Sequence, residues 1–433
     1  MGAVKIGIIG LGTIGKGVYE AIVNNGGLIE QRTGVSLIVK AVCDKDKSAL
    51  NAIKGPAELI KTVSADDVLG EKDIDVIVEL IGGIDPAKDI ILKAIGANKH
   101  VVTANKALLS SEWKAIFSAA GKKGVVVNFE AAVGGAIPII RTLKMSFVAD
   151  NIRTIYGILN GTTNFMLTEM SEKGCSFDDA LKVAQKKGIA ESDPALDVSG
   201  ADSAHKLAIL SLLGFGADVS GDDIYTEGIT AIGSEDIVNA SKWGYSIKLL
   251  AIAKNTPEGL ELRVHPTLIR SSHLLSSVKG ADNAIFVKGD LIGESLLFGK
   301  GAGSKPTSSS VVADIVEIAG KIKSGLSCCA LPPEPDYASG KIKKKKIEEL
   351  VIPYYLRFSA IDRPGVLASI SSVLAKNNIS IANVAQEERK EGETVPVIIL
   401  THKAKEGDMR KAIAKIDPLD CIKGATVVIR IEE

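Results

Sequence analysis

The feature that most constrains this chain is a glycine-rich turn near its N-terminus. The apolar run 5–9 is typical of a short buried strand, and Val18, Ile22 and Val23 then have the spacing of one helix face. The turn between them has the pattern G-x-G-x-x-G, which in a strand-to-helix setting indicates dinucleotide binding. It consists of Gly10, Leu11, Gly12, Thr13, Ile14 and Gly15.

Each of the three glycines in this turn is expected for a steric reason. Gly10 permits a tight bend, Gly12 lets the backbone approach a pyrophosphate, and Gly15 lets the helix pack closely on the strand. The free N–H groups at the start of the helix can bind the anion. We therefore predict that a dinucleotide cofactor is bound by Gly10, Gly12, Thr13, Ile14 and Gly15.

The second predicted strand, 36–43, ends at an acidic residue, Asp44. A carboxylate at this place can accept hydrogen bonds from the adenosine ribose and would repel a 2′-phosphate, which favours NAD. The next residue, Lys45, can serve that phosphate instead, and Asp44 lies further from the glycines than is usual. The sequence therefore favours NAD and leaves NADP open.

Strands and helices alternate beyond this point. Two predicted strands, 74–80 and 100–103, are separated by a helical stretch at 86–95. This alternation predicts an α/β domain with a doubly wound parallel sheet of the Rossmann type, and such sheets bind ligands at the carboxyl ends of their strands. The segments 82–83 and 104–106 lie at two of these ends.

Two segments rich in small residues come next. The first follows a predicted strand at 125–129, begins at Glu130 and ends at Pro138. One carboxylate with nearby carbonyls suits a hard cation, although the residue types alone favour a structural turn. The second, 160–164, follows a strand at 155–159 and is crowded with Asn, Gly and Thr. It can cap the next helix or line a polar pocket, and the sequence leaves both open.

Four acidic residues precede a lysine between residues 188 and 206. Asp202 and Lys206 are spaced i, i+4, so on a helix they share one face and can form a surface ion pair. The same face continues as an apolar stripe to Leu213, where burial would lower the pKa of the lysine. A second ammonium, Lys106, would lower that pKa further.

A lysine of this kind suits hydride transfer. Reduction of an aldehyde leaves an alkoxide, and a positioned ammonium both stabilises this charge and supplies the proton. The surrounding acids can then hold the ammonium group of an amino-acid substrate. These residues predict an oxidoreductase site around Lys206.

Composition excludes other classes of function. Basic and acidic residues balance at 52 each, so no net field attracts nucleic acid or an anionic membrane. No apolar segment reaches the roughly 20 residues that span a bilayer, and no signal-peptide pattern is present, so we expect a cytoplasmic protein. The five cysteines and five histidines lack zinc-binding spacing. We interpret the adjacent pair Cys328 and Cys329 as reduced thiols.

In combination and in order, these motifs resemble those of homoserine dehydrogenase. The resemblance covers residues 1 to about 325 and includes the glycine turn and the segments 102–106, 130–138, 160–164, 190–206 and 301–307. It implies NAD(P)-dependent interconversion of L-aspartate 4-semialdehyde and L-homoserine, in threonine, methionine and isoleucine biosynthesis. It also implies that Lys206 is the proton donor and that Lys106 contacts the cofactor and the reacting centre.

The resemblance implies further site residues. Glu191 and Asp202 would bind the substrate, with Asp197 supporting the site. Gly188 and Gly303 would contact the cofactor.

The same resemblance implies a sodium ion held by Glu130 and by the carbonyls of Val133, Gly135 and Ile137. Many members of the family have a basic residue suited to NADP at the end of the second strand. Because Asp44 and Lys45 occupy that region here, the cofactor preference is not carried over.

The C-terminal third has the pattern of a regulatory domain. The proline-rich residues 332–335 and the lysine run 341–346 mark a linker, and we expect this run to be a solvated connector. Beyond it the predicted order βαββαβ is ferredoxin-like. The residues 362–367 resemble the first turn of an ACT domain, a module that binds amino acids, often between paired copies. The implied effector is threonine, near Asp362, Gly365 and Asn383; a purely structural role in dimerisation is the alternative.

We therefore predict four regions: a Rossmann NAD(P)-binding domain (1–135), an α+β catalytic and dimerisation domain (136–325), a linker (326–351) and an ACT domain (352–433). A homodimer or homotetramer is expected. Two other functions stay open: another amino-acid or semialdehyde dehydrogenase, and a non-catalytic sensor of NAD and an amino acid. The presence of both Lys106 and Lys206 argues against the sensor.

Overall fold

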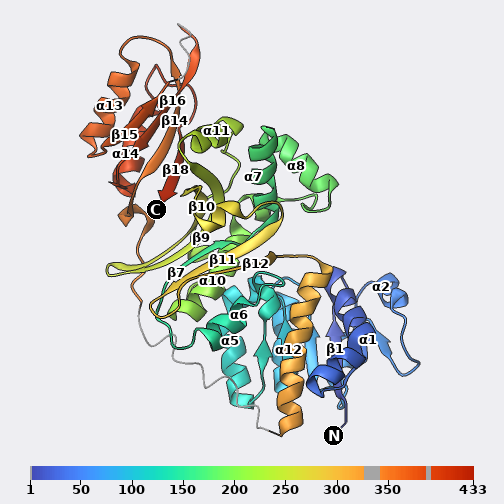
Figure 1. Cartoon of the computed structure of the whole chain (residues 1–433). Helices are drawn as coiled ribbons and strands as arrows, with labels where there is room; N and C mark the ends of the chain where they lie inside the picture. The colour runs from blue at the N-terminus through green and yellow to red at the C-terminus, as the bar shows by residue number, and fades with distance from the viewer. Residues whose placement is uncertain (1, 326–341, 387–391) are drawn as a thin grey trace. The chain divides into compact units, whose positions relative to one another are not determined.

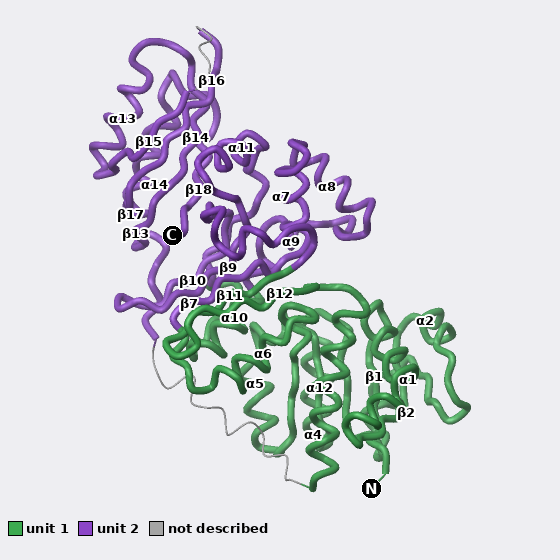
Figure 2. The backbone as a smooth tube through the Cα atoms, viewed as in Figure 1, with its two compact units in different colours: residues 1–152, 205–223, 283–341 green, residues 153–204, 224–282, 342–433 purple. Residues whose placement is uncertain are grey.

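The computed structural model describes the chain apart from residues 1, 326–341 and 387–391. Its contacts divide the chain into two compact units, which Figure 2 colours separately. The first unit comprises residues 1–152, 205–223 and 283–341, and the second comprises residues 153–204, 224–282 and 342–433. Cys328, Cys329 and most of the predicted linker lie outside the described residues.

The first unit is built on a sheet of six parallel strands. Their order is β3-β2-β1-β4-β5-β6, and every neighbouring pair is parallel. This doubly wound order confirms the predicted fold. The strands are β1 (Val4–Ile9), β2 (Leu37–Cys43), β3 (Ile60–Thr62), β4 (Val76–Glu79), β5 (His100–Thr103) and β6 (Val127–Asn128).

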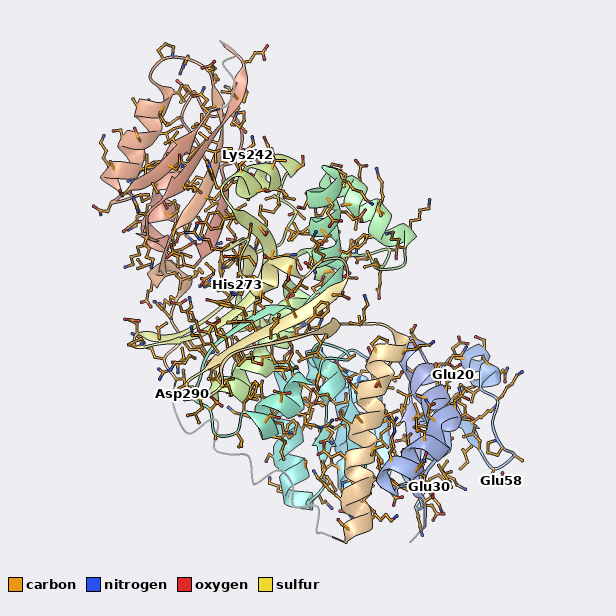
Figure 3. All side chains as sticks on the ribbon, in the orientation of Figure 1. Glu20, Glu30, Glu58, Lys242, His273 and Asp290 are labelled. Atoms are coloured by element: carbon orange, nitrogen blue, oxygen red, sulfur yellow. The ribbon has the colours of Figure 1, made fainter. Side chains whose placement is uncertain are left out.

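Two long helices pack side by side in this unit (Figure 1). Helix α1 (Thr13–Thr33) follows the glycine turn and buries Val18 and Ile22, whereas Glu20 and Glu30 lie on its exposed side (Figure 3). Helix α12 (Ser304–Ser324) comes from a later segment and buries Ile315 in the same core as α1. The other elements are α2 (Lys47–Ala52), α3 (Ala65–Gly70), α4 (Asp85–Gly96), α5 (Lys106–Lys123), α6 (Ile139–Arg141), β11 (Asp282–Gly289) and β12 (Gly293–Lys300).

The second unit is built on a mixed sheet. Its strand order is β7-β9-β10-β18-β14-β16-β15, with the short β8 beside β10. The two longest strands, β9 and β10, form an antiparallel hairpin in which Thr256 pairs with Gly259. The strands are β7 (Ile152–Ile158), β8 (Tyr225–Thr226), β9 (Tyr245–Thr256), β10 (Gly259–Arg270), β14 (Tyr354–Ile361), β15 (Ile381–Ala385), β16 (Thr394–Thr401) and β18 (Val427–Glu432).

The C-terminal part of this unit has the order β14-α13-β15-β16-α14-β18, which confirms the predicted ferredoxin-like arrangement. Helices α13 (Val366–Lys376) and α14 (Glu406–Ile416) bury Ile370 and Met409 in a core of their own with Phe358. The short strands β13 (Val351–Ile352) and β17 (Ala404–Lys405) pair separately. Strand β18 also pairs in parallel with β10, so this sheet continues into that of the middle third.

The remaining helices lie in the middle third. They are α7 (Gly161–Lys173), α8 (Phe177–Lys186), α9 (Ala195–Val198), α10 (Ala201–Phe215) and α11 (Ser234–Lys242). Helix α10 starts in the second unit and ends in the first. Among the described residues, none of the helices has the length and apolar character needed to cross a membrane.

The end of the lysine run differs from its prediction. Lys345 has a side chain only 12% exposed, and its Nζ lies 3.0 Å from Glu261 Oε1 on β10. Lys345 is therefore not part of a solvated connector. The reason is that Leu260 donates its N–H to the carbonyl of Lys343, which brings this segment alongside β10.

Candidate active site

The glycine turn has the geometry that its sequence predicts. Gly10 has φ +99°, and a Cβ there would lie 2.7 Å from the backbone of Leu80. A Cβ on Gly15 would lie 1.8 Å from the carbonyl oxygen of Gly10, so only glycine permits this packing of helix on strand. Gly12 faces open space, because a Cβ at this residue would have no atom within 4 Å. In this turn, packing within the protein requires glycine at Gly10 and Gly15, whereas at Gly12 the space beside the backbone is free for a ligand.

A pocket lies beside this turn at the carboxyl ends of the strands. Asp44 closes one side of it: its Oδ2 accepts a hydrogen bond from the N–H of Leu11 at 2.6 Å and its Oδ1 accepts one from Asp46 at 2.8 Å. Asp44 and Lys45, the two residues that bear on cofactor preference, both line the pocket. The lining is Ile9, Gly10, Gly12, Cys43, Asp44, Lys45, Val63, Ala65, Leu80, Ile81, Gly82, Pro86 and Ile90.

Lys106 starts helix α5 at the end of strand β5. The preceding residue, Asn105, is the N-cap, and its side chain accepts a hydrogen bond from the N–H of Leu108 at 3.2 Å. The Asn105 side chain also donates to the carbonyl of Gly83 at 2.7 Å. The two strand ends that the sequence singled out, 82–83 and 104–106, are thus joined directly.

The loop after β6 is buried around Glu130. Its carboxylate accepts hydrogen bonds from the N–H groups of Ile140 at 2.8 Å and Arg141 at 2.9 Å, while burial raises its pKa. The backbone N–H of Glu130 donates to Asp314 on α12 at 2.8 Å, and burial raises the pKa of that carboxyl to about 7. The sequence did not single out Asp314.

The predicted sodium ligands Glu130, Val133, Gly135 and Ile137 all belong to this loop. A carboxylate with three backbone carbonyls is a suitable donor set for a hard cation, because such oxygens keep lone pairs beyond their protein hydrogen bonds. The carbonyl oxygen of Gly135, for example, accepts one hydrogen bond from Ser310 Oγ at 2.7 Å and keeps its second lone pair. The described residues contain no cluster of three or more His, Cys, Asp or Glu side chains that could hold a metal.

In the second unit, two of the predicted substrate-binding acids meet at one amide. The side-chain nitrogen of Asn160 donates to Asp197 Oδ1 at 2.7 Å and to Asp202 Oδ2 at 3.0 Å. The side-chain oxygen of Asn160 accepts from the N–H of Thr163 at 2.8 Å, which caps α7. The segment 160–164 therefore does both things that its sequence left open: it caps a helix and forms part of a polar cluster.

The other predicted residues of this cluster are more exposed. Glu191 and Gly188 both lie at the surface of the loop between α8 and α9, and Gly188 has φ +68°. Thr162 Oγ1 donates to the carbonyl of Ile189 at 3.1 Å, so this loop is tied to the start of α7.

Helix α10 carries both Asp202 and Lys206. The two residues are only 7% and 8% exposed, so an exposed surface ion pair does not describe them. The apolar stripe predicted for this helix is also buried, including Ile209 and Leu210. Lys206 is thus a buried lysine on a core-facing helix, as the hydride-transfer interpretation predicts.

Comparisons with known proteins agree along the whole chain. Residues 10–130 match the family model described as the NAD binding domain of homoserine dehydrogenase, residues 138–316 that of homoserine dehydrogenase, and residues 354–418 that of the ACT domain. A homoserine dehydrogenase of Pseudomonas aeruginosa is 43% identical over 439 residues, covering 100% of both chains. This chain belongs to the homoserine dehydrogenase family.

Solved structures of the family are similar as well. A homoserine dehydrogenase from Thiobacillus denitrificans has a TM-score of 0.93 and 43% identity, covering 100% of this chain and 99% of that one. A hyperthermophilic archaeal homoserine dehydrogenase in complex with NADPH has a TM-score of 0.62 and 26% identity, covering 74% of this chain and 98% of that one. The predicted resemblance to homoserine dehydrogenase with a C-terminal ACT domain is confirmed.

In this family member, the predicted effector residues lie near the first turn of the ACT domain. Asp362 follows β14, and its Oδ2 is buried with no hydrogen-bond partner among the residues that the structure describes. Gly365, with φ +91°, is the N-cap of α13. Asn383 is exposed on β15, which ends the strand order of its sheet.

The sequence of this homoserine dehydrogenase did not single out two polar residues that join several parts of the site by hydrogen bonds. Asn160 was noted only as part of a polar segment, although an amide beside several acids is a detectable signal. Glu79 was not noted at all. It ends the apolar strand β4 and is fully buried, and a carboxylate at the ligand-binding end of such a strand could have been singled out.

Proposed function

We propose that this chain catalyses the NAD(P)-dependent interconversion of L-aspartate 4-semialdehyde and L-homoserine, in threonine, methionine and isoleucine biosynthesis. The observation that carries the proposal is the convergence of Asp197 and Asp202 on Asn160, with the buried Lys206 one helical turn beyond Asp202 on α10. This arrangement supports the proposal, because the predicted substrate-binding acids and the predicted proton donor lie on or beside helix α10.

The roles of the residues follow from the reaction. The nicotinamide of the cofactor supplies or accepts the hydride. In the direction of reduction, the Lys206 ammonium gives its proton to the oxygen of the aldehyde as the hydride arrives at carbon. In the direction of oxidation, the neutral amine takes the hydroxyl proton. Lys106, at the start of α5, adds a second positive charge that stabilises the developing alkoxide.

Substrate recognition is assigned to the acids of the second unit. Glu191 and Asp202 bind the ammonium group of the amino-acid substrate, and Asp197 supports them through the shared Asn160 amide. Gly188 and Gly303 contact the cofactor. Gly303 has φ +116°, a conformation that L side chains rarely adopt, and it leads into helix α12.

The cofactor preference is assigned to the pocket beside the glycine turn. Asp44 is fixed there by the N–H groups of Leu11 and Asp46, so a carboxylate lies where the adenosine ribose is expected. This favours NAD. Lys45 lines the same pocket and offers a cation to a 2′-phosphate, and a relative binds NADPH.

Two further ligands are part of the proposal. Glu130 with the carbonyls of Val133, Gly135 and Ile137 would hold a sodium ion, whose contribution is to rigidify the loop after β6. Threonine would bind the ACT domain, with its ammonium group donating to the Oδ2 of Asp362, for which the described part of the chain supplies no partner. A homodimer or homotetramer, and a cytoplasmic location, stay predictions.

The test is oxidation of L-homoserine by the purified protein, followed by nicotinamide absorbance with NAD and NADP in parallel. Reduction of either cofactor is expected, and the ratio of the two rates decides the role of Asp44. A folded, cofactor-binding protein that reduces neither would contradict the proposal. Repeating the assay in sodium-free buffer and with added threonine tests the two further ligands.

A further inference from the structure

Glu79 is a buried carboxylate that the proposed mechanism does not use. It is the last residue of β4, at 0% exposure, and the three residues before it are Val76, Ile77 and Val78. Burial raises its pKa. Because a carboxylate in such surroundings is unfavourable unless several donors reach it, its partners indicate what it does.

The partners of Glu79 come from the loop after β4 and from the last residue of β5. Its Oε1 accepts the N–H of Ile81 at 2.9 Å, and its Oε2 accepts the hydroxyl of Thr103 at 2.7 Å. The nearby N–H of Gly82 and side chain of Asn105 act against burial and lower the pKa of this carboxyl, but burial outweighs them. One side chain thus binds the loop after β4 and the end of β5 together.

The first loop forms part of the cofactor pocket. Ile81 and Gly82 line that pocket, and Gly82 and Gly83 have φ +71° and +74°. Two consecutive residues in the left-handed region take this loop out of the strand conformation directly after β4. The Glu79 carboxylate holds the start of the loop by accepting the N–H of Ile81.

The second loop leads to Lys106. Thr103 Oγ1, while donating to Glu79, accepts the N–H of Asn105 at 3.0 Å. Asn105 then donates to the carbonyl of Gly83 and caps the helix that Lys106 begins. The orientation of this helix start therefore depends on the same carboxylate that holds the cofactor loop.

We propose that Glu79 is a positioning residue for hydride transfer: its carboxylate fixes the cofactor loop 81–83 relative to the start of α5, which carries Lys106. The proposal rests on the proposed function of Lys106. Because Glu79 is fully buried, it would act through Ile81 and Thr103 and not by contact with a reactant.

The experiment compares four variants of the full-length protein. Glu79→Gln keeps the shape of the side chain but turns one acceptor into a donor, and Thr103→Val removes the hydroxyl that links the two loops. Thr103→Ser keeps this hydroxyl. Lys99→Met is the matched control. Lys99 lies just before β5, and its Nζ donates to the carbonyls of Glu71 and Ile74 just before β4, so this side chain joins the opposite ends of the same two strands.

We expect Glu79→Gln and Thr103→Val to lower kcat for homoserine oxidation by roughly 10- to 100-fold, since small displacements of reacting groups have effects of that size. Both should also weaken binding of the reduced cofactor, measured by fluorescence with NADH and NADPH in parallel. The KM for homoserine should change little, because its predicted binding acids lie in the other unit. Thr103→Ser should behave as wild type. Lys99→Met should change the unfolding temperature and not kcat.

Two results would overturn the proposal. One is a Thr103→Val protein with the kcat and cofactor affinity of wild type. The other is a Lys99→Met protein that loses as much kcat as Thr103→Val, which would mean that any weakening of this sheet suffices. The cofactor titration needs no substrate, so it tests the role of Glu79 even if the wild type failed to oxidise homoserine.

Discussion

At the cofactor end of the first unit and at the junction of β10 with β18 in the second unit, charged side chains are partly or fully buried, but their hydrogen-bond partners differ. At the cofactor end, Asp44 and Glu79 accept hydrogen bonds mainly from backbone N–H groups of nearby loops. At the junction, charged side chains bind each other. Arg263, 1% exposed, binds Glu432 and Glu261.

A second ion cluster lies along the same junction. Arg430 on β18 binds Glu406 of α14 at 2.6 Å and Glu227 at 2.7 Å. Glu406 also accepts the hydroxyl of Tyr354 at 2.9 Å. These residues come from the middle third and from the ACT domain, so the ion pairs hold together segments far apart in the sequence.

This difference in partners distinguishes two roles of a charged side chain that is shielded from solvent. A carboxylate that binds loop amides fixes the shape of a site, so its loss should first affect catalysis. An ion pair between two strands is worth little relative to apolar packing, but removing one partner leaves the other charge buried and unpaired. Its loss should first affect stability. Four predictions test this separation.

The largest effect should come from Lys206→Ala. Loss of the proton donor is expected to lower kcat by about 100- to 10,000-fold, the range for general acid–base groups. NADPH affinity should be retained, as measured by fluorescence titration. Lys186→Ala, an exposed lysine on α8, is the control. Turnover that survived in Lys206→Ala would show that another group donates the proton.

Next comes Arg263→Met at the junction. This change removes the fully buried cation and leaves Glu432 with Lys254 and Glu261 with Lys345, so it should lower the free energy of unfolding by up to about 3–5 kcal/mol, measured in urea. The kcat of the folded fraction should stay unchanged. The exposed Arg153→Met on β7 serves as the control. A clear loss of kcat would break the comparison, because the junction would then serve catalysis as well.

A third effect should appear in acid. Burial alone would raise the pKa of Glu432, but Arg263 and Lys254 outweigh burial and lower it from 4.5 to about 2. A carboxyl with a depressed folded-state pKa stabilises the protein above its unfolded pKa. That stability, about 3 kcal/mol, should be lost as the pH falls from 4.5 toward 2.

Unfolding in urea at a series of pH values measures this loss. Glu432→Gln should be less stable than wild type near neutral pH, and its stability should fall less steeply between these two pH values. Equal slopes for the two proteins would mean that the junction does not hold this carboxylate ionised.

The smallest effect should come from Gly12→Ala. A Cβ on Gly12 meets no atom of the protein, so unfolding should be unaffected, whereas the added methyl group would obstruct the pyrophosphate. We expect roughly tenfold weaker NADPH binding, which corresponds to about 1.4 kcal/mol. Unchanged affinity would show that the pyrophosphate does not approach the turn at Gly12.

Much of the fold was predictable because its signals are local. The glycine turn, the alternation of strands and helices, and the βαββαβ order all depend on residues within a few positions of each other. The same holds for Asp202 and Lys206, whose spacing already places them on one helix face. The resemblance to homoserine dehydrogenase then assigned roles that spacing alone left open.

The tertiary structure decided the rest. No local pattern predicted the β9–β10 hairpin, the packing of α12 against α1, or the pairing of β18 with β10. The convergence of two acids on Asn160 and the two loops held by Glu79 were not foreseen either. Periodicity reports which face of an element is apolar, but not which distant element covers that face. Partners such as Glu227 and Arg430 are therefore chosen only when the whole chain folds.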